Sequence, residues 1–174
     1  IYAGSYGWAS AGRFHHAQSQ LHRFLNSIGG YTKSVNTYSF AAAEVIVPHV
    51  IGHFRDYIYN QTSWKSVRDD CELFVAFGGV PLKNGQIGQG GLGRHIQKES
   101  ILAAHQNGVE FVSISPLRSD MIDDVQAEWL QIRPNSDAAL MIGICYVLFD
   151  EKLQDQAFLD RYSVGVENFA EYLM

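Results

Sequence analysis

The stretch that decides the fold class is Leu-Phe-Val-Ala-Phe at residues 73–77, a short run that is apolar at every position. Continuous apolar runs, unlike alternating ones, are typical of strands covered on both faces, as in a parallel sheet. Two further strand-like runs lie at 111–114 and 129–132, and helices are predicted over 94–106 and 136–149. This order of elements predicts an α/β fold with a doubly wound, mostly parallel sheet and helices on both faces.

The N-terminal part is expected to extend the same fold. Residues 1–4 form a predicted buried strand, and an apolar stripe over 10–28, closed by two glycines, predicts a long helix. A second helix is expected over 40–50, where Pro48 would kink or shorten it. The irregular, aromatic stretch at 52–65 is a possible domain seam.

Composition limits the function. With 174 residues, 47% hydrophobic and 18% charged, the chain suits one folded α/β unit over 1–174 that buries roughly 70% of its unfolded surface. The net charge of -5 argues against nucleic-acid binding, because no basic stripe is present to displace counterions. No apolar run approaches the ~18 residues of a membrane span. The chain begins in a predicted strand without a methionine or leader, so we expect an internal fragment of a longer protein.

Several short motifs favour structural interpretations. Residues 88–93 spell GxGxxG, but about ten residues separate them from the preceding strand, which favours a loop over a dinucleotide fingerprint. His49 and His53 have the spacing of helical metal ligands, yet the neighbouring proline and glycine interrupt a regular helix. The two cysteines, Cys71 and Cys145, lie in apolar runs and are expected to be buried thiols rather than a disulfide.

Three loops that follow predicted strands carry polar and cationic side chains: Pro81–Asn84, Ser115–Ser119 and Arg133–Asp137. The carboxyl ends of parallel strands meet at one edge, so these loops are expected to converge on one crevice. Lysine, arginine and helix N-termini there suit a phosphate-bearing ligand with a polar base. The alternative is capping by Asn135 or Ser136, with Asp137 favourable to the helix dipole. From the residues alone, both interpretations stay open.

The opening segment presents Tyr6 and Trp8 directly after the first predicted strand, and Ser39 lies at the mouth of the second predicted helix. At the carboxyl edge of a sheet these side chains would form a polar cluster of the kind that binds ligands. Ser39 as a plain N-cap, with Tyr6 and Trp8 as packing aromatics, explains the same residues. Spacing alone does not make them catalytic.

These segments resemble parts of the molybdenum enzymes that reduce S-oxides and N-oxides, namely the dimethyl sulfoxide, trimethylamine N-oxide and biotin sulfoxide reductases. The resemblance covers essentially the whole chain in order. It is carried by Gly4–Arg13, Tyr38–Ala43, Pro48–Gly52, Gln61–Trp64, Phe169–Leu173 and the three strand-end loops. The loop Asn84–Gly91 is most similar to the biotin sulfoxide and trimethylamine N-oxide reductase branch. One departure is Asn36-Thr37, where the family usually has Gly-Asp before the Tyr-Ser pair.

The resemblance implies a bis(molybdopterin guanine dinucleotide) molybdenum cofactor in the full-length parent and oxygen-atom transfer from a small S-oxide or N-oxide substrate. Ser39 matches the serine that ligates the metal, and neither cysteine stands at that position. Tyr6 and Trp8 match catalytic residues that donate hydrogen bonds at the oxo group and substrate oxygen, Trp8 also on the cofactor side. The positions that match one dinucleotide pocket are Lys83, Ser115, Arg118, Asn135, Ser136 and Asp137.

Further partners implied for the parent are its remaining domains and an electron donor of unknown identity. The second dinucleotide needs segments outside this sequence, so the isolated chain is expected to bind no cofactor and to be inactive. The compartment is left open between the bacterial periplasm and cytoplasm. The competing hypothesis is a non-catalytic α/β nucleotide-binding or protein-interaction module, in which Ser39 and Tyr6 need not lie together.

Overall fold

The computed structural model describes residues 1–10, 12, 14–37, 39–86 and 93–174. Its sheet contains β1 (Leu73–Phe77), β2 (Glu110–Ile114) and β3 (Glu128–Leu130), in the order β1-β2-β3 and parallel throughout. The predicted α/β class and the parallel sheet are therefore confirmed, and the strand at 73–77 has the predicted bounds.

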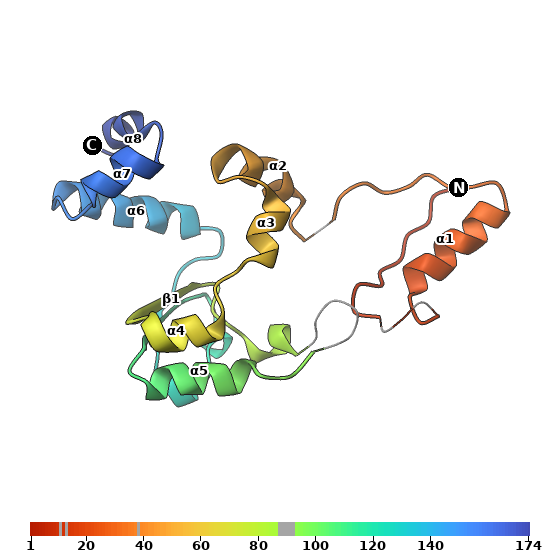
Figure 1. Cartoon of the computed structure of the whole chain (residues 1–174), viewed down its shortest axis with the longest axis horizontal. Coiled ribbons are helices and arrows are strands. Elements are labelled where there is room, and N and C mark those ends of the chain that lie inside the picture. The colour runs from red at the N-terminus through yellow and green to blue at the C-terminus, as the bar shows by residue number, and fades with distance from the viewer. Residues whose placement is uncertain (11, 13, 38, 87–92) are drawn as a thin grey trace.

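The described helices differ in length and position from one end of the chain to the other. In chain order they are α1 (Ala17–Ser27), α2 (Ala41–Val50), α3 (Phe54–Tyr59), α4 (Trp64–Asp70), α5 (Gln97–Gln106), α6 (Asp137–Asp150), α7 (Gln156–Tyr162) and α8 (Val166–Leu173), with 3-10 helices η1 (Leu82–Gly85), η3 (Arg118–Asp120) and η4 (Asp123–Val125). Figure 1 shows α4 and α5 side by side against the sheet, with α6 to α8 grouped near the C-terminus and α1 at the far end of the molecule. Among the described residues, no helix combines the length and apolar character that crossing a membrane requires.

The core lies between the sheet and the pair α4 and α5. Ile101 and Ala104 of α5 are fully buried and belong to one apolar cluster with Ala76 and Phe111 of the strands. On α4, Trp64 stacks on Phe74 with ring centroids 5.6 Å apart. Alternate strand residues point to opposite faces, so this cluster accounts for one face of β1.

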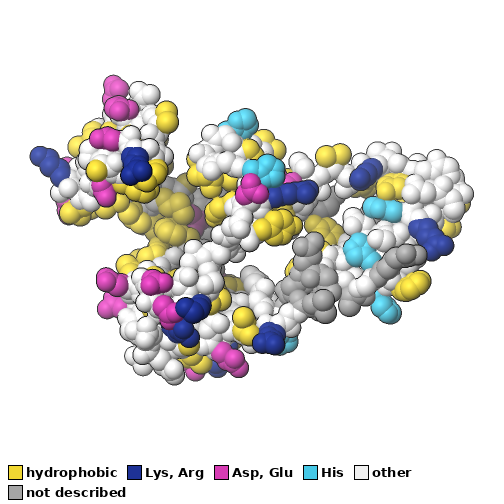
Figure 2. All heavy atoms as spheres, viewed as in Figure 1, with side chains coloured by type: hydrophobic (Ala, Val, Ile, Leu, Met, Phe, Trp, Pro, Cys, Tyr) yellow, Lys and Arg dark blue, Asp and Glu magenta, His cyan; other side chains and the backbone are white. Residues whose placement is uncertain are grey.

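The other face of β1 is open. Leu73, Val75 and Phe77 are 52%, 41% and 36% exposed. The chain as a whole exposes 13280 Å², whereas a compact protein of 19.5 kDa exposes about 8,500 Å². Figure 2 shows hydrophobic side chains on the surface of the C-terminal helices as well. The described chain therefore presents apolar surface that a compact protein of this size would bury.

The N-terminal elements are shorter than predicted. The strand expected at 1–4 is a single parallel bridge between Tyr2 and Thr32, supported by a Thr32 N–H to Ile1 carbonyl bond of 2.8 Å. The helix expected from residue 10 begins only at Ala17. Gly12 has a φ of 72°, which a right-handed helix excludes, and the N-cap His16 has an extended backbone with a ψ of 92°. The helix ends as predicted, with both Gly29 and Gly30 at positive φ.

Between α2 and β1 the chain is more regular than predicted. The stretch at 52–65, expected to be irregular, contains α3 and the start of α4, whose N-cap Ser63 accepts a 3.2 Å hydrogen bond from the Ser66 N–H. Pro48 lies inside α2, which continues to Val50. The possible seam in this stretch stays a prediction. Both cysteines are free, as expected, but each is half-buried and neither is fully buried as predicted.

Candidate functional site

The segments that carry Tyr6 and Ser39 meet at Thr37. The Tyr6 hydroxyl lies 3.5 Å from Thr37 Oγ1, although the two residues are 31 positions apart. The same Oγ1 accepts a 3.1 Å hydrogen bond from the Ser39 N–H. One threonine hydroxyl thus contacts both segments, through the Tyr6 side chain on one side and the Ser39 backbone on the other. These segments are joined by the isolated Tyr2–Thr32 bridge and lie outside the sheet of β1, β2 and β3. A direct approach of the Ser39 and Tyr6 side chains at one sheet edge stays a prediction.

Ser39 does not cap the following helix. The N-cap of α2 is Phe40, and no side chain caps this terminus. Ser39 is exposed, and within the described residues the only hydrogen bond recorded for it is donated by its backbone. The capping interpretation of Ser39 is therefore wrong, and its hydroxyl oxygen is available to a ligand.

The turn before Ser39 explains how the chain accommodates Asn36-Thr37. Asn36 has a φ of 64°, a left-handed conformation that asparagine tolerates better than most residues. Thr37 then accepts the N–H two residues further on, which is the hydroxyl version of an Asx turn. Thr37 thus supplies the side-chain acceptor of this turn.

Tyr6 and Trp8 stand on a turn that packs against the start of α1. A side chain on Gly7, which lies between them, would lie 2.7 Å from the His16 ring. His16 is the N-cap of α1, and its Nδ1 accepts the Ser19 N–H at 3.1 Å. Tyr6 and Trp8 are 53% and 48% exposed, so neither is a core aromatic.

The loops after β1 and β2 carry the two cations of the second predicted cluster. The parallel sheet places both loops at the same edge, as predicted. Lys83 lies in η1 and Arg118 at the start of η3, and both side chains are exposed. The loops are joined by a 2.7 Å hydrogen bond from the Val80 N–H to the Asp120 carbonyl.

The hydroxyl, carbonyl and N–H groups of Ser115 all form hydrogen bonds with other described residues. It is fully buried, and its hydroxyl donates to Asp120 Oδ2 at 2.5 Å and accepts the Leu117 N–H at 3.3 Å. Its carbonyl accepts the Trp129 Nε1–H at 2.9 Å, and its N–H donates to the Leu130 carbonyl at 3.2 Å. Ser115 therefore holds the loop, and the direct cofactor contact predicted for it is not available here.

The third loop leads into α6. Asn135 is exposed with a φ of 66°, and Ser136 is the N-cap. The Ser136 hydroxyl donates back to the Arg133 carbonyl at 2.6 Å and makes no capping bond, so the predicted capping role of its side chain is wrong. Asp137 is half-buried in the first turn of α6, where its charge favours the helix dipole.

A cavity of about 580 Å³ opens beside Arg118 under the edge of β3. Its lining includes Ser113, Ser119 and Trp129. Ser113 is 1% exposed, and its hydroxyl has no hydrogen-bond partner within the described residues. The lining also includes Asp123, Met121 and Ile122, so the cavity is mixed in character and has both a cation and a carboxylate at its wall.

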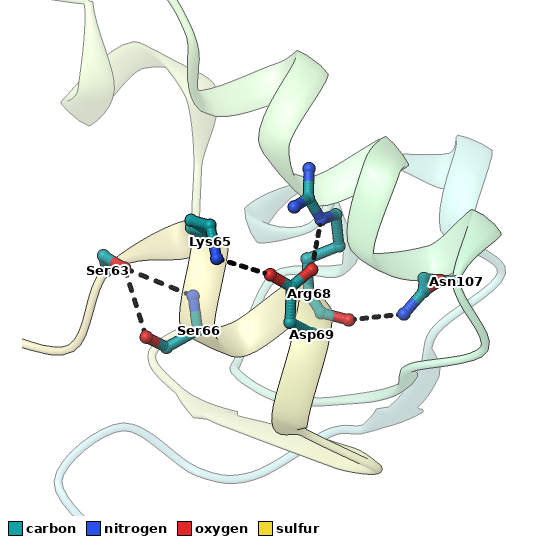
Figure 3. Close-up of polar contacts among 6 residues, drawn as sticks. All are labelled: Ser63, Lys65, Ser66, Arg68, Asp69 and Asn107. Carbon is teal, nitrogen blue, oxygen red and sulfur yellow. Dashed lines mark hydrogen bonds and ion pairs between the residues drawn. The ribbon is translucent and has the colours of Figure 1, made fainter.

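A separate polar group lies on α4 (Figure 3). Asp69 accepts hydrogen bonds from Arg68 at 2.7 Å and Lys65 at 2.9 Å. The hydrogen bond from Arg68, which has the largest effect, and the one from Lys65 hold the pKa of the Asp69 carboxyl well below its usual range. Asn107 donates to the Arg68 carbonyl at 2.7 Å and ties the end of α5 to α4. Because α4 precedes β1, this group lies at the amino edge of the sheet and braces the helices.

Two sequence motifs contribute nothing to the described site. Most of the GxGxxG run, residues 88–92, lies outside the described residues, as do parts of the loop at 84–91. His53 lies 4.0 Å from Asp56 in an exposed pair. In the part of the chain that the structure describes, no three His, Cys, Asp or Glu side chains gather as a metal site would require.

Comparison with known proteins defines the class. The chain matches the molybdopterin oxidoreductase family over residues 1–171 and belongs to it. That membership implies a molybdenum–molybdopterin cofactor.

The individual relatives narrow the comparison. The chain is 40% identical over 173 residues to the biotin sulfoxide reductase of Cereibacter sphaeroides, covering 99% of this chain and 23% of that protein. It is 37% identical to the dimethyl sulfoxide/trimethylamine N-oxide reductase of the same organism, covering 99% of this chain and 21% of the relative. With the trimethylamine-N-oxide reductase of Haemophilus influenzae the identity is 34%, covering 100% and 21%. The chain thus spans between a fifth and a quarter of the length of these relatives.

Proposed function

We propose that this chain is part of a molybdenum oxidoreductase that reduces S-oxides or N-oxides by oxygen-atom transfer. In this proposal it contributes the metal ligand Ser39 and part of the pocket for a bis(molybdopterin guanine dinucleotide) cofactor. The observation that carries the proposal is the contact of Thr37 with both the Tyr6 and the Ser39 segments, with the Ser39 hydroxyl exposed and not used for capping. The remaining domains and an electron donor complete the enzyme.

The residues present fit such a cofactor. A serine alkoxide is a hard oxygen donor suited to a high-valent metal. The turn that holds the Ser39 backbone through Thr37 leaves the side-chain oxygen exposed at the surface. When bound, the cofactor supplies the two-electron chemistry that removes the oxygen atom from the substrate.

Tyr6 and Trp8 orient the substrate in this proposal. Their O–H and N–H groups are the kind of fixed donors that stabilise negative charge developing on a transferred oxygen. The support is their position on one turn, half exposed, with Tyr6 in contact with Thr37 beside Ser39. Trp8 would also bind the cofactor.

The strand-end loops bind one dinucleotide. Lys83 and Arg118 pair with phosphate oxygens, Arg118 through its planar guanidinium fork. Asn135 and the first turn of α6 would hold the polar base, and the Asp137 carboxylate could accept hydrogen bonds from the guanine N1–H and amino group. Ser115 supports this pocket from within the loop, and Ser136 holds the turn through Arg133.

The test is Ser39→Ala in the full-length protein. Loss of the alkoxide ligand is expected to change the molybdenum spectrum and to abolish or strongly reduce turnover, while the far-UV circular dichroism stays as in the unchanged protein. An unchanged spectrum would show that another residue is the ligand. The isolated chain is expected to have no oxide reductase activity, and cofactor-dependent turnover by it would contradict the proposal that further domains are needed.

A further inference from the structure

We propose that Asp120 is a positioning residue that locks the loops after β1 and β2 together and thereby fixes the placement of Lys83 relative to Arg118. The inference rests on the dinucleotide-binding role proposed above for these two cations. Asp120 itself makes no ligand contact in this inference; it acts through the loops that carry the two side chains.

Within the loop after β2, the Asp120 side chain closes a short ring. Its Oδ2 accepts the hydroxyl of Ser115, five residues earlier, at 2.5 Å. Ser115 is fully buried and also accepts the Leu117 N–H at 3.3 Å. A carboxylate that accepts a buried hydroxyl makes a stronger bond than a neutral acceptor would. Arg118 therefore starts η3 from a turn that is held on both sides.

Between the loops, the Asp120 backbone makes the connection. Its carbonyl accepts the Val80 N–H at 2.7 Å. Gly79, one residue earlier, has a φ of +71°, and a side chain there would collide with the Asp120 carbonyl oxygen and Cβ. The two backbones approach so closely that only glycine fits at this position.

The first loop is also held from the helix side. Gln97 of α5 donates from Nε2 to the Val80 carbonyl at 3.2 Å and to the Pro81 carbonyl at 3.4 Å. The segment that leads to Lys83 is therefore fixed between α5 and Asp120. Loops that are ordered before a ligand arrives lose less conformational entropy on binding. The expected consequence is tighter cofactor retention, with no direct effect on the chemistry.

The test uses full-length protein with Asp120→Ala, Asp120→Asn and Ser115→Ala, and Asp124→Asn as the matched control. Asp124 is an exposed aspartate in the neighbouring η4, where it pairs with Lys98 at 3.5 Å. Hydrogen exchange is measured on cofactor-free protein for peptides covering residues 78–86 and 115–122. Asp120→Ala and Ser115→Ala should each accelerate exchange in both peptides by about 10- to 100-fold, the loss of a hydrogen bond to an ionised acceptor. Asp120→Asn keeps an oxygen that can accept the Ser115 hydroxyl, so its exchange rates should lie between those of Asp120→Ala and the unchanged protein. Asp124→Asn should exchange at the rate of the unchanged protein.

The second measurement is molybdenum and guanine content per polypeptide at limiting cofactor supply, with turnover per bound molybdenum. Asp120→Ala should lower cofactor content and leave turnover per molybdenum unchanged, and Asp120→Asn should restore much of the content. Exchange unchanged in either peptide would overturn the lock. Asp120→Asn as damaging as Asp120→Ala would overturn it too. The asparagine oxygen still accepts the Ser115 hydroxyl, so equal damage would show that this hydrogen bond does not hold the loops.

Two variants separate this inference from the proposed function. If Lys83→Met and Arg118→Met lower cofactor content while a loosened Asp120→Ala protein keeps it, positioning by Asp120 is refuted and the pocket assignment stands. If neither cation variant changes the content, the pocket assignment fails, and a role of Asp120 in placing those cations for the cofactor fails with it. Should Asp120→Ala not fold, Ser115→Ala and Asp120→Asn make the same comparison.

Discussion

Replacing Thr37 with valine tests the juxtaposition on which the proposed function depends. Valine has nearly the shape of threonine and lacks the hydroxyl, so the change removes the acceptor of the Ser39 N–H and the contact with Tyr6. Thr37 is only half-buried, so no large cavity or desolvation term is involved. The loss is that of one ordinary hydrogen bond and one long contact.

The size of the effect follows from those two distances. At 3.1 Å the Ser39 bond is of normal length, and a neutral hydrogen bond contributes about 0.5–1.5 kcal/mol. The Tyr6 contact, at 3.5 Å, lies at the limit of hydrogen bonding and adds little. If these contacts hold Ser39 and Tyr6 in the arrangement needed for turnover, losing their free energy in Thr37→Val should lower turnover by about 2- to 10-fold.

The assay is turnover per bound molybdenum in the full-length protein, together with the molybdenum spectrum and thermal unfolding. Thr37→Ser is the matched control, because it keeps the hydroxyl and should retain both the spectrum and most of the turnover. Thr37→Val should alter the spectrum, since the ligand turn is less well held, with only a small change in Tm. Equal behaviour of the serine and valine variants would refute the reasoning.

Three further predictions address other parts of the molecule. If the Asp137 carboxylate binds guanine, Asp137→Asn should weaken cofactor binding by roughly 1.5–3 kcal/mol, the value of a charged hydrogen bond, and lower cofactor content at limiting supply. Full molybdenum and guanine content, with only about 0.3–1 kcal/mol of stability lost, would show that Asp137 acts only on the helix dipole. Gly79→Ala should destabilise the protein by more than about 1 kcal/mol in a urea titration, because Gly79 has a positive φ and a side chain there would collide with Asp120. The control Gly143→Ala, at an open position within α6, should leave stability unchanged or slightly higher. Equal Cm values for the two variants would argue against the close approach of Gly79 to Asp120. The pKa of Asp69 is lowered, so the stability that its ionised carboxylate contributes is present above the ordinary carboxyl pKa of about 3.9 and is lost as pH falls through the lowered pKa. Asp69→Asn should therefore lose less stability on acidification than the unchanged protein. Identical stability profiles of the variant and the unchanged protein below pH ~4 would contradict this.

The sequence predicted best where one local property decides the structure. Residues 73–77 form a strand with the predicted bounds because every position is apolar. The paired glycines end α1 as expected because both adopt positive φ. By contrast, the strand expected at 1–4 is a single bridge between Tyr2 and Thr32, because an apolar run does not by itself supply a partner strand.

The candidate site shows the same division. The loop positions of Lys83 and Arg118 follow from the strand ends, which a sequence pattern locates. The roles of Thr37 and Asp120 depend on contacts with Tyr6 and Val80, which no local signal reveals. Capping of α6 by Asn135 or Ser136 was one of two open interpretations. The Ser136 hydroxyl donates to the Arg133 carbonyl instead, a choice between two nearby partners that propensity does not decide.

The apolar surface described earlier bears on how this chain acquires its structure. The unit of β1, β2 and α5 encloses its own buried cluster, so we expect it to form early and locally. Helix α6 has no buried residue, and Met141, Ile144 and Val147 are each more than 40% exposed. A helix that is apolar on all sides is stable when enclosed by other elements. During synthesis, α6 and the open face of β1 would therefore expose apolar surface until other segments cover it. We expect chaperones to bind this surface, and we expect the chain to aggregate when it is expressed alone.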